Sequence, residues 1–303
     1  MVPPPSGEQF EIVSGAHRAV LVEVGGGIRE YWHGDRAVLD GYGTDEMCSG
    51  ARGTPLVPWP NRLADGRYTF DGATHQAALT EPKAQNAIHG LARWRSWSAR
   101  ERSADRITLG IVLHPMTGYP FTLDVAIDYR VGPEGLTVTT NATNLGDVPC
   151  PFGSGQHPYL AAGDGLVDEL TCELAARTWI PTDDRGLPAG REEVAGSEFD
   201  FRSGRAIGTT RLDHAFTDLD RDGDGLAWVR LGSSAGPVTA VWLDDHYRYV
   251  QLFSGDTLGP DHRRRGLAVE PMTCPANGFN SGDGLVRLEP GQTFSTRWGI
   301  QPG

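Results

Sequence analysis

Glu270 is the side chain whose setting first suggests chemistry. It follows the apolar residues 267–269 and precedes Pro271. A short apolar run predicts a buried strand, and because proline has no N–H to donate, we expect this strand to stop at Glu270. A carboxylate at the end of a buried strand must be paired or used. It serves either as a structural acceptor for the next loop or as an acid–base group.

His157 is a second candidate for proton transfer, far upstream in the chain. It lies in residues 153–160, G-S-G-Q-H-P-Y-L, where glycines open space around the ring and Pro158 is expected to end the strand. An imidazole titrates near neutral pH, which suits proton donation to a bound ligand. The alternative is a turn histidine bonded to the backbone.

Residues 58–62, P-W-P-N-R, combine groups that bind sugars. Trp59 offers an aromatic face, while Asn61 and Arg62 offer polar groups that can form paired hydrogen bonds. We expect Phe253 to be a second aromatic side chain beside a ligand. The alternative for Arg62 is an ion pair with a surface acid.

His89, in N-A-I-H-G-L, and Asp213, in L-D-H-A-F, are further candidates for contact with ligand hydroxyls. The glycine after His89 permits a sharp turn, so the imidazole can lie at the end of a short segment. The alternatives are a histidine satisfied in the core and an aspartate that caps a turn.

Arg263, Arg264 and Arg265 form the most concentrated basic cluster of an acidic chain. Lys and Arg total 27 against 39 Asp and Glu, which gives a net charge of −12. Such a balance argues against partners with a phosphate backbone and against an anionic membrane surface. The cluster is either a solvated loop or a clamp for an anionic substituent on a small-molecule substrate.

The composition favours a cytoplasmic protein with free thiols. The chain has 303 residues and four cysteines, at 48, 150, 172 and 274, without a C-x-x-C pair. No basic and apolar leader begins the sequence, and no run of about 18 apolar residues could span a bilayer. We therefore expect neither a metal site nor contact with a membrane.

The elements that must hold these candidate residues are β-strands. Apolar and polar residues alternate in segments 107–113, 121–131, 136–139, 238–253 and 294–300. The 40 glycines and 21 prolines suit many short strands joined by turns. Because no segment has the period of a long amphipathic helix, we predict an all-β protein. It should form one large antiparallel β-sandwich over residues 10–303, behind a loose tail at residues 1–9.

Five motifs together resemble the aldose 1-epimerase (galactose mutarotase-like) family. They are P-W-P-N-R-L, N-A-I-H-G-L, G-Q-H-P-Y-L, L-D-H-A-F and A-V-E-P-M-T-C-P, in the family's order. The resemblance implies a large β-sandwich with an open cleft, and interconversion of the α and β anomers of a free aldose of the glucose or galactose type. The form H-P-Y-L differs from the H-x-Y-F of typical galactose mutarotases, so the preferred sugar stays open.

Residue by residue, the resemblance implies that Glu270 is the general base and His157 the general acid. By the same comparison, Arg62, His89 and Asp213 hold the sugar, and Asn61 matches the pattern beside Arg62. The expected reaction needs one base and one acid and no cofactor or metal. We expect a monomer or homodimer. Three alternatives stay open: an epimerase of a phosphorylated or sulfonated hexose, a glycoside hydrolase that uses Asp213 and Glu270, and a non-catalytic sugar-binding protein.

Overall fold

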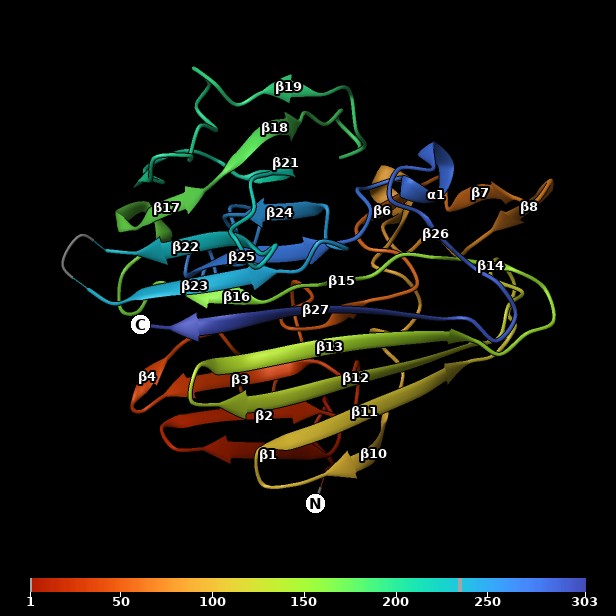
Figure 1. The fold of residues 1–303 in the computed structure, drawn as a ribbon, viewed down its shortest axis with the longest axis horizontal. Coiled ribbons are helices and arrows are strands. Elements are labelled where there is room, and N and C mark those ends of the chain that lie inside the picture. Colours follow the sequence, from red (N-terminus) through yellow and green to blue (C-terminus); the bar gives the residue numbers. More distant parts are fainter. Residues whose placement is uncertain (1, 234–235) are drawn as a thin grey trace.

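Alternating apolar and polar residues build the larger of the two main antiparallel sheets (Figure 1). Our computed structural model describes residues 2–233 and 236–303. In this part of the chain nine strands pair in the order β10 (Ser98–Arg102), β11 (Arg106–Leu113), β12 (Leu123–Gly132), β13 (Gly135–Asn144), β27 (Thr293–Pro302), β23 (Val238–Leu243), β22 (Ala227–Gly232), β17 (Thr171–Leu174) and β20 (Arg205–Ala206). Along β12, buried and partly exposed residues alternate, as the sequence pattern predicted.

The second large sheet has eight described strands and is made of shorter and more continuously buried segments. Seven of them lie in the order β19 (Glu192–Glu193), β18 (Ala176–Ile180), β21 (Asp213–Leu219), β24 (Tyr249–Phe253), β25 (Gly266–Met272), β15 (Gly155–Gln156) and β5 (Pro55–Leu56), and β16 (Tyr159–Ala161) also pairs with β25. Every residue of β25 is buried. This burial on both faces explains its run of apolar residues without alternation.

Smaller sheets complete the sandwich. The N-terminal sheet contains β1 (Gln9–Ser14), β2 (His17–Val22), β3 (Ile28–His33) and β4 (Arg36–Ala37); three two-stranded sheets pair β6 (Arg62–Ala64) with β9 (Asn86–Ile88), β7 (Arg67–Phe70) with β8 (Ala73–Gln76), and β14 (Cys150–Phe152) with β26 (Val286–Leu288). The helical elements described are α1 (Gly278–Ser281) and the 3₁₀ turns η1 (Pro82–Ala84) and η2 (Val167–Glu169). None of these helices has the length and apolar character that crossing a membrane requires. The prediction of an all-β sandwich is confirmed.

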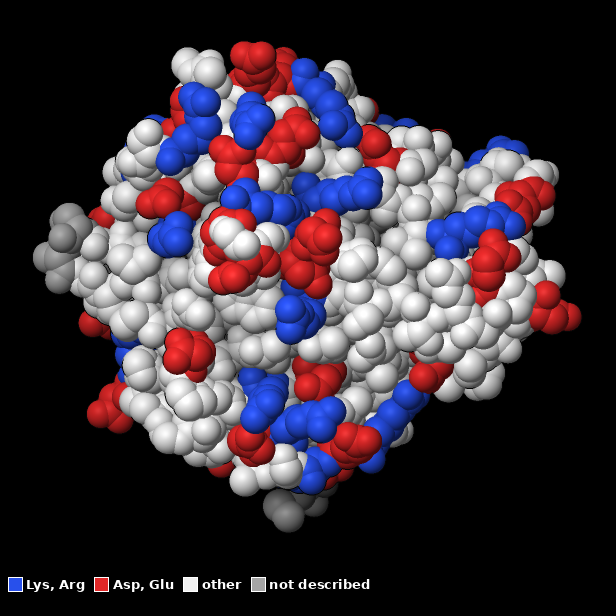
Figure 2. Space-filling model, viewed as in Figure 1, with Lys and Arg blue, Asp and Glu red and all other residues white. Residues whose placement is uncertain are grey.

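The core and the surface also agree with the composition. Trp97 and Trp298 are fully buried between strands, and the four cysteines are free and buried. On the face seen in Figure 2, basic and acidic side chains are interspersed, without an extended area of one sign.

The ordered structure begins earlier than the predicted tail. β1 starts at Gln9, inside the segment we expected to be loose. The carbonyl groups of Ser6 and Glu8 accept hydrogen bonds from the N–H groups of Val24 and Glu23, at 3.0 Å each. Backbone pairing therefore ties the chain down from about Ser6 onward, which the polar composition of this segment did not reveal.

Pro271 does not end its strand, so the prediction that the strand stops at Glu270 is wrong. β25 continues to Met272, and Pro271 pairs with Val250 of β24. The N–H groups of Val269 and Thr273 both donate toward the neighbouring segment that contains β15. Pro271 lies two residues from each, so its missing N–H falls on that same side. The ladder toward β24 therefore loses no bond.

The turn after β9 is fixed by a close contact between the backbones of Gly90 and Val57. Gly90 has a φ of +69°, and a Cβ atom at this position would lie 2.0 Å from the carbonyl oxygen of Val57. Only glycine fits such an approach. Because Val57 and Gly90 form a bridge and His89 precedes Gly90, this contact positions the His89 backbone.

We predict that Gly90→Ala lowers the free energy of unfolding much more than Gly72→Ala. Gly72 also has a positive φ, +78°, but a Cβ there would meet nothing within 4 Å. Gly72→Ala should therefore cost only the left-handed backbone strain, about 1–2 kcal/mol. Gly90→Ala adds a clash with fixed backbone. Urea unfolding of both variants measures the difference, and equal losses would contradict the proposed contact.

Candidate functional site

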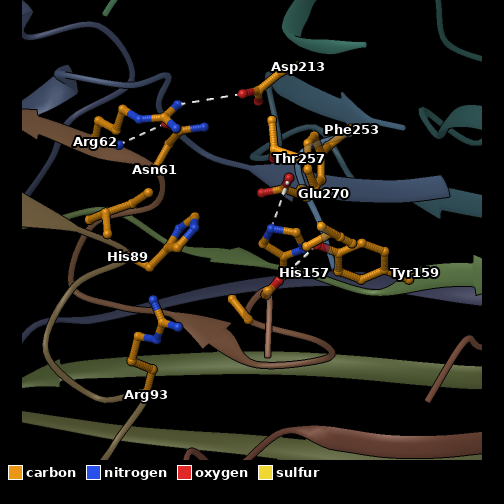
Figure 3. A pocket seen from close by; sticks show the side chains of 14 residues that line it. Asn61, Arg62, His89, Arg93, His157, Tyr159, Asp213, Phe253, Thr257 and Glu270 are labelled. Atoms are coloured by element: carbon orange, nitrogen blue, oxygen red, sulfur yellow. Dashed lines mark hydrogen bonds and ion pairs between the residues drawn. The ribbon is translucent and has the colours of Figure 1, made fainter. Parts of the chain in front are cut away.

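One polar cavity collects nearly all of the predicted site residues (Figure 3). Its volume is about 210 Å³, below the ~300–1,000 Å³ typical of sites for drug-sized ligands, so it suits a single small molecule. Its walls are formed by Gly50, Ala51, Asn61, Arg62, Ile88, His89, Arg93, His157, Tyr159, Asp213, Phe253, Thr257, Leu258 and Glu270. Seven of the eight predicted residues are among them.

The register of the eight-stranded sheet places the key side chains in two adjacent rows. In the first row Asp213 of β21 pairs with Phe253 of β24, which pairs with Ala268 of β25, which pairs with Tyr159 of β16. Residues directly paired across neighbouring strands point to the same face of the sheet. The four side chains therefore line one side of the sheet, and alanine at the centre leaves room above the row.

The second row contains both candidates for proton transfer. Gln251 pairs with Glu270 across β24 and β25. The pairing of Gly155 with Met272 and of Tyr159 with Ala268 puts His157 opposite Glu270. The His157 Nε2 and Glu270 Oε1 atoms lie 3.3 Å apart, and both side chains are almost completely buried.

Burial acts on the two groups in opposite directions. Desolvation, followed by the charge of Arg93, lowers the pKa of His157 to about 3. Desolvation, followed by repulsion from Asp213, raises the pKa of Glu270 well above its usual range. Burial therefore widens the pH range in which the pair holds one proton in total. Such a pair can pass a proton to one atom of a ligand and take one from another.

Arg62 lies in the cavity wall opposite His157 and Glu270, where the two-stranded sheet of β6 and β9 and two ion pairs hold it. It pairs with Ile88 across β6 and β9, which brings Arg62 and His89 to one edge of the cavity. Its Nε atom donates to Glu81 at 2.9 Å, and its Nη1 atom lies 3.8 Å from the Asp213 carboxylate. The ion pair that we gave as its alternative therefore exists, but the guanidinium still lines the cavity.

Asn61 and Asp213 are oriented by neighbouring groups. The Asn61 Oδ1 atom accepts a hydrogen bond from the Arg62 N–H at 2.8 Å. The Asp213 Oδ1 atom accepts one from the Gln251 side chain at 2.7 Å. Both side chains therefore face the cavity in fixed positions and keep further polar atoms for a ligand.

His89 is a neutral imidazole beside His157. The two rings meet edge to face with centroids 5.4 Å apart. Desolvation, together with the nearby His157 and Arg93, lowers the pKa of His89 well below 6.5. Its φ is +61°, a backbone conformation stabilised by the turn at Gly90.

Four buried polar atoms around the cavity have no hydrogen-bond partner within the described residues. They are Nδ1 of His89, Nε of Arg93, Nδ1 of His157 and Oε2 of Glu270. Buried polar atoms are normally satisfied, so unpaired ones that cluster at a cavity mark a place where a polar ligand binds.

Tyr159, Arg93 and Thr257 also line the cavity, although the sequence did not single them out. The Tyr159 ring stacks on His157 with centroids 4.9 Å apart, and its hydroxyl donates to the Gly50 carbonyl at 2.8 Å. Its spacing of two from His157 was a usable signal, since such residues share a face of a strand. Arg93 and Thr257 lie in loops without a periodic pattern.

The structure does not bring Trp59 into the cavity. Its side chain is 2% exposed and packs edge to face on Phe279 in the core. Trp59 lies between Pro58 and Pro60 with its indole in the core, whereas Asn61 and Arg62 after Pro60 line the cavity. Its role as a sugar-stacking residue is therefore a wrong prediction, whereas Phe253 does line the cavity.

The arginine cluster also lies outside this cavity. Arg264 is buried and bonds the carboxylates of Asp168 and Asp256, and Arg265 donates to the backbone of Asp164. Arg263 is exposed and lines a neighbouring hollow. Two of the three arginines therefore hold loops together. The hollow beside Arg263 shares Asp213, Phe253 and Thr257 with the cavity, so the clamp stays an alternative for that one arginine.

The cavity side chains are not gathered as ligands around a metal position. Among the described residues, only Asp244, Asp245 and His246 have donor atoms close enough to one another to hold an ion, and none of them lines the cavity.

Comparison with known proteins agrees with the fold and the motifs. The family model for aldose 1-epimerase matches residues 8–301, so the chain belongs to the aldose 1-epimerase family. It is 34% identical over 288 residues to the uncharacterized protein YihR of Escherichia coli, covering 95% of this chain and 91% of that protein. It is 28% identical over 258 residues to the aldose 1-epimerase of Escherichia coli, covering 74% and 71%. The crystal structure of a GalM/aldose epimerase homologue from Caenorhabditis elegans has the same fold, with a TM-score of 0.88, 19% identity and 98% coverage of both chains.

We predict that Glu270→Gln leaves the free energy of unfolding at pH 7 unchanged or raises it by up to about 2 kcal/mol. The pKa of Glu270 is higher in the folded than in the unfolded chain, so its carboxyl group destabilises the fold above the unfolded value and not below it. The gain should therefore vanish as the pH falls below about 4.

Urea unfolding at pH 7 and pH 4 measures this difference. Glu193→Gln is the matched control, because Glu193 is exposed on the edge strand β19 and should change little at either pH. A loss of more than about 1 kcal/mol in Glu270→Gln at pH 7 would show that the charged carboxylate stabilises the fold.

Proposed function

We propose that the protein is an aldose 1-epimerase that interconverts the α and β anomers of a free hexose. The observation that supports this most strongly is the buried contact between His157 and Glu270, 3.3 Å apart in a cavity of monosaccharide size. Membership of the aldose 1-epimerase family supports the same reaction class and a sugar substrate.

In this proposal, proton transfer at two oxygens opens the sugar ring. Glu270 takes the proton from the C1 hydroxyl while His157 gives one to the ring oxygen O5. The C1–O5 bond breaks, C1 becomes an aldehyde and turns about the C1–C2 bond, and the ring closes on the other face. The two groups exchange roles on closure. Both oxygens are bonded to C1, so neighbouring acid and base groups can reach them together.

The competent state for this step is the tautomer in which Glu270 is ionised and His157 is protonated. It carries the same single proton as the neutral pair, so one proton shift along the 3.3 Å contact produces it. Polar hydroxyls of a bound sugar favour the charged tautomer, because they supply hydrogen bonds to the unpaired atoms of the pair.

The other walls hold the sugar. Arg62 and Asp213 offer a donor and an acceptor to ring hydroxyls, and Asn61 and His89 add further polar atoms. Phe253 presents an aromatic face to the C–H side of the ring. Positions fixed by ladders and ion pairs favour one orientation of C1 toward the proton-transfer pair.

We predict that Glu270→Gln and His157→Asn each lower kcat for anomer interconversion by about 10²–10⁴-fold. KM should change far less, because each substitution keeps the size and polarity of the side chain. Polarimetry of freshly dissolved α-D-glucose and α-D-galactose, with the spontaneous rate subtracted, measures both constants. His246→Asn is the control, because His246 is exposed and away from the cavity walls. Near-normal turnover in either variant would remove that residue from the mechanism.

The pH dependence should reflect a pair that holds one proton. A second proton binds only as the pH falls toward the lowered pKa of His157, about 3, and the single proton leaves only above the raised pKa of Glu270. We therefore predict that the acid-side decline of kcat/KM lies below about pH 4, near the lowered pKa of His157. A decline centred near pH 6.5, the ordinary imidazole value, would contradict the neutral resting pair.

A further inference from the structure

Arg93 is a cation in the cavity to which the proposed reaction gives no role. It follows the short bridge at Gly90, and its guanidinium lies beside His89, on the side of His157 away from Arg62 (Figure 3). It lines the same cavity as Glu270 and His157. Its charge is close enough to lower the pKa of both histidines.

Unlike Arg62, Arg93 has no carboxylate beside it in the described residues. Arg62 bonds Glu81 and faces Asp213, whereas the Arg93 side chain makes neither an ion pair nor a hydrogen bond, and its Nε atom is buried and unpaired. Its one defined partner is the exposed ring of Trp94, 4.9 Å from the guanidinium carbon. A mostly buried cation without a counter-ion is unfavourable unless a ligand supplies one.

If the sugar binds in the orientation that the proposed reaction requires, its C6 carbon lies near Arg93. C1 carries the oxygen O1, the oxygen O5 and the carbon C2. If Glu270 acts at O1 and His157 at O5, C2 and its neighbours extend toward Arg62 and Asp213. O5 is bonded to C5, which carries C6, so the C6 substituent lies on the far side of His157. Arg93 occupies that side.

We propose that Arg93 binds an anionic group on C6 of the hexose, and that the preferred substrate is a hexose with a carboxylate, phosphate or sulfonate at that position. This inference rests on the proposed function for the identity of O1 and O5. A guanidinium is suited to all three anions, because its planar N–H groups match their paired oxygens. The three therefore share one recognition chemistry.

An anion at Arg93 would also affect the proton-transfer pair. The positive charge of Arg93 opposes protonation of His157, and a bound anion offsets that charge. A C6 anion should therefore favour the protonated His157 that the reaction needs. The benefit would be visible in kcat as well as in KM.

The test compares glucose with three C6-anionic sugars: glucuronate, glucose 6-phosphate and 6-deoxy-6-sulfoglucose. Anomer exchange for each is measured by NMR in buffer without phosphate or sulfate. We expect kcat/KM for at least one anionic sugar to exceed that for glucose about tenfold or more. Arg93→Met should lower the ratio of this value to that for glucose by about tenfold to a hundredfold. The sugar with the highest ratio identifies the anion.

Two matched variants separate charge recognition from general damage. Arg95→Met removes an exposed arginine two residues away that does not line the cavity, and it should leave both rates and their ratio unchanged. Arg93→Lys keeps the charge but loses the paired geometry, so it should retain part of the preference. An equal loss for glucose and for the anionic sugar in Arg93→Met would overturn the proposal, and so would a wild-type preference for glucose over all three.

Calorimetric binding distinguishes this proposal from the proposed function. If no sugar is epimerised but a C6-anionic sugar binds more tightly than glucose, and Arg93→Met abolishes the difference, the anion site stands and the catalytic role fails. If glucose is epimerised rapidly but no anionic sugar binds more tightly, the catalytic role stands and the anion site is refuted.

Discussion

A carboxylate that is almost completely buried and has one unpaired oxygen is costly to ionise, and this constraint at Glu270 organises the site. The imidazole 3.3 Å away is equally buried, so burial disfavours the charged form of both groups. This widens the pH range in which the two groups share one proton that can reside on either partner. The burial that would weaken a lone acid or base therefore produces a pair suited to take and give protons at adjacent oxygens.

The surrounding strands make this pair possible by their register. His157 and Glu270 face each other because β15 and β16 share one register with β25. The row beside it, from Asp213 to Tyr159, leaves space above the small Ala268. The nine-stranded sheet contributes no cavity residue. Every residue of β25 is buried, so the strand is apolar on either side of Glu270 without alternation.

Alternation in the sequence was sufficient to predict the long strands, and five ordered motifs were sufficient to predict seven cavity residues. The predictions for Trp59 and Pro271 were wrong and Arg93 was not predicted, each for a physical reason. Trp59 satisfied the chemistry of sugar stacking, but the direction of a side chain in a proline-rich loop depends on tertiary packing. Pro271 continues its strand because its missing donor faces an unused position, which depends on register. Arg93 has nothing distinctive around it in sequence, since the absence of a counter-ion is visible only in three dimensions.

The most direct test of the central claim compares free aldoses with a methyl glycoside, whose C1 oxygen has no proton to give. NMR can follow the α and β signals of each sugar with and without the protein. The account predicts faster anomer exchange of a free aldose, to the same final ratio, and no change in the methyl glycoside. Release of a free sugar from the glycoside would contradict the account and indicate hydrolysis. Unchanged exchange in every free aldose, neutral or anionic at C6, would show that the His157–Glu270 pair does not transfer protons at C1.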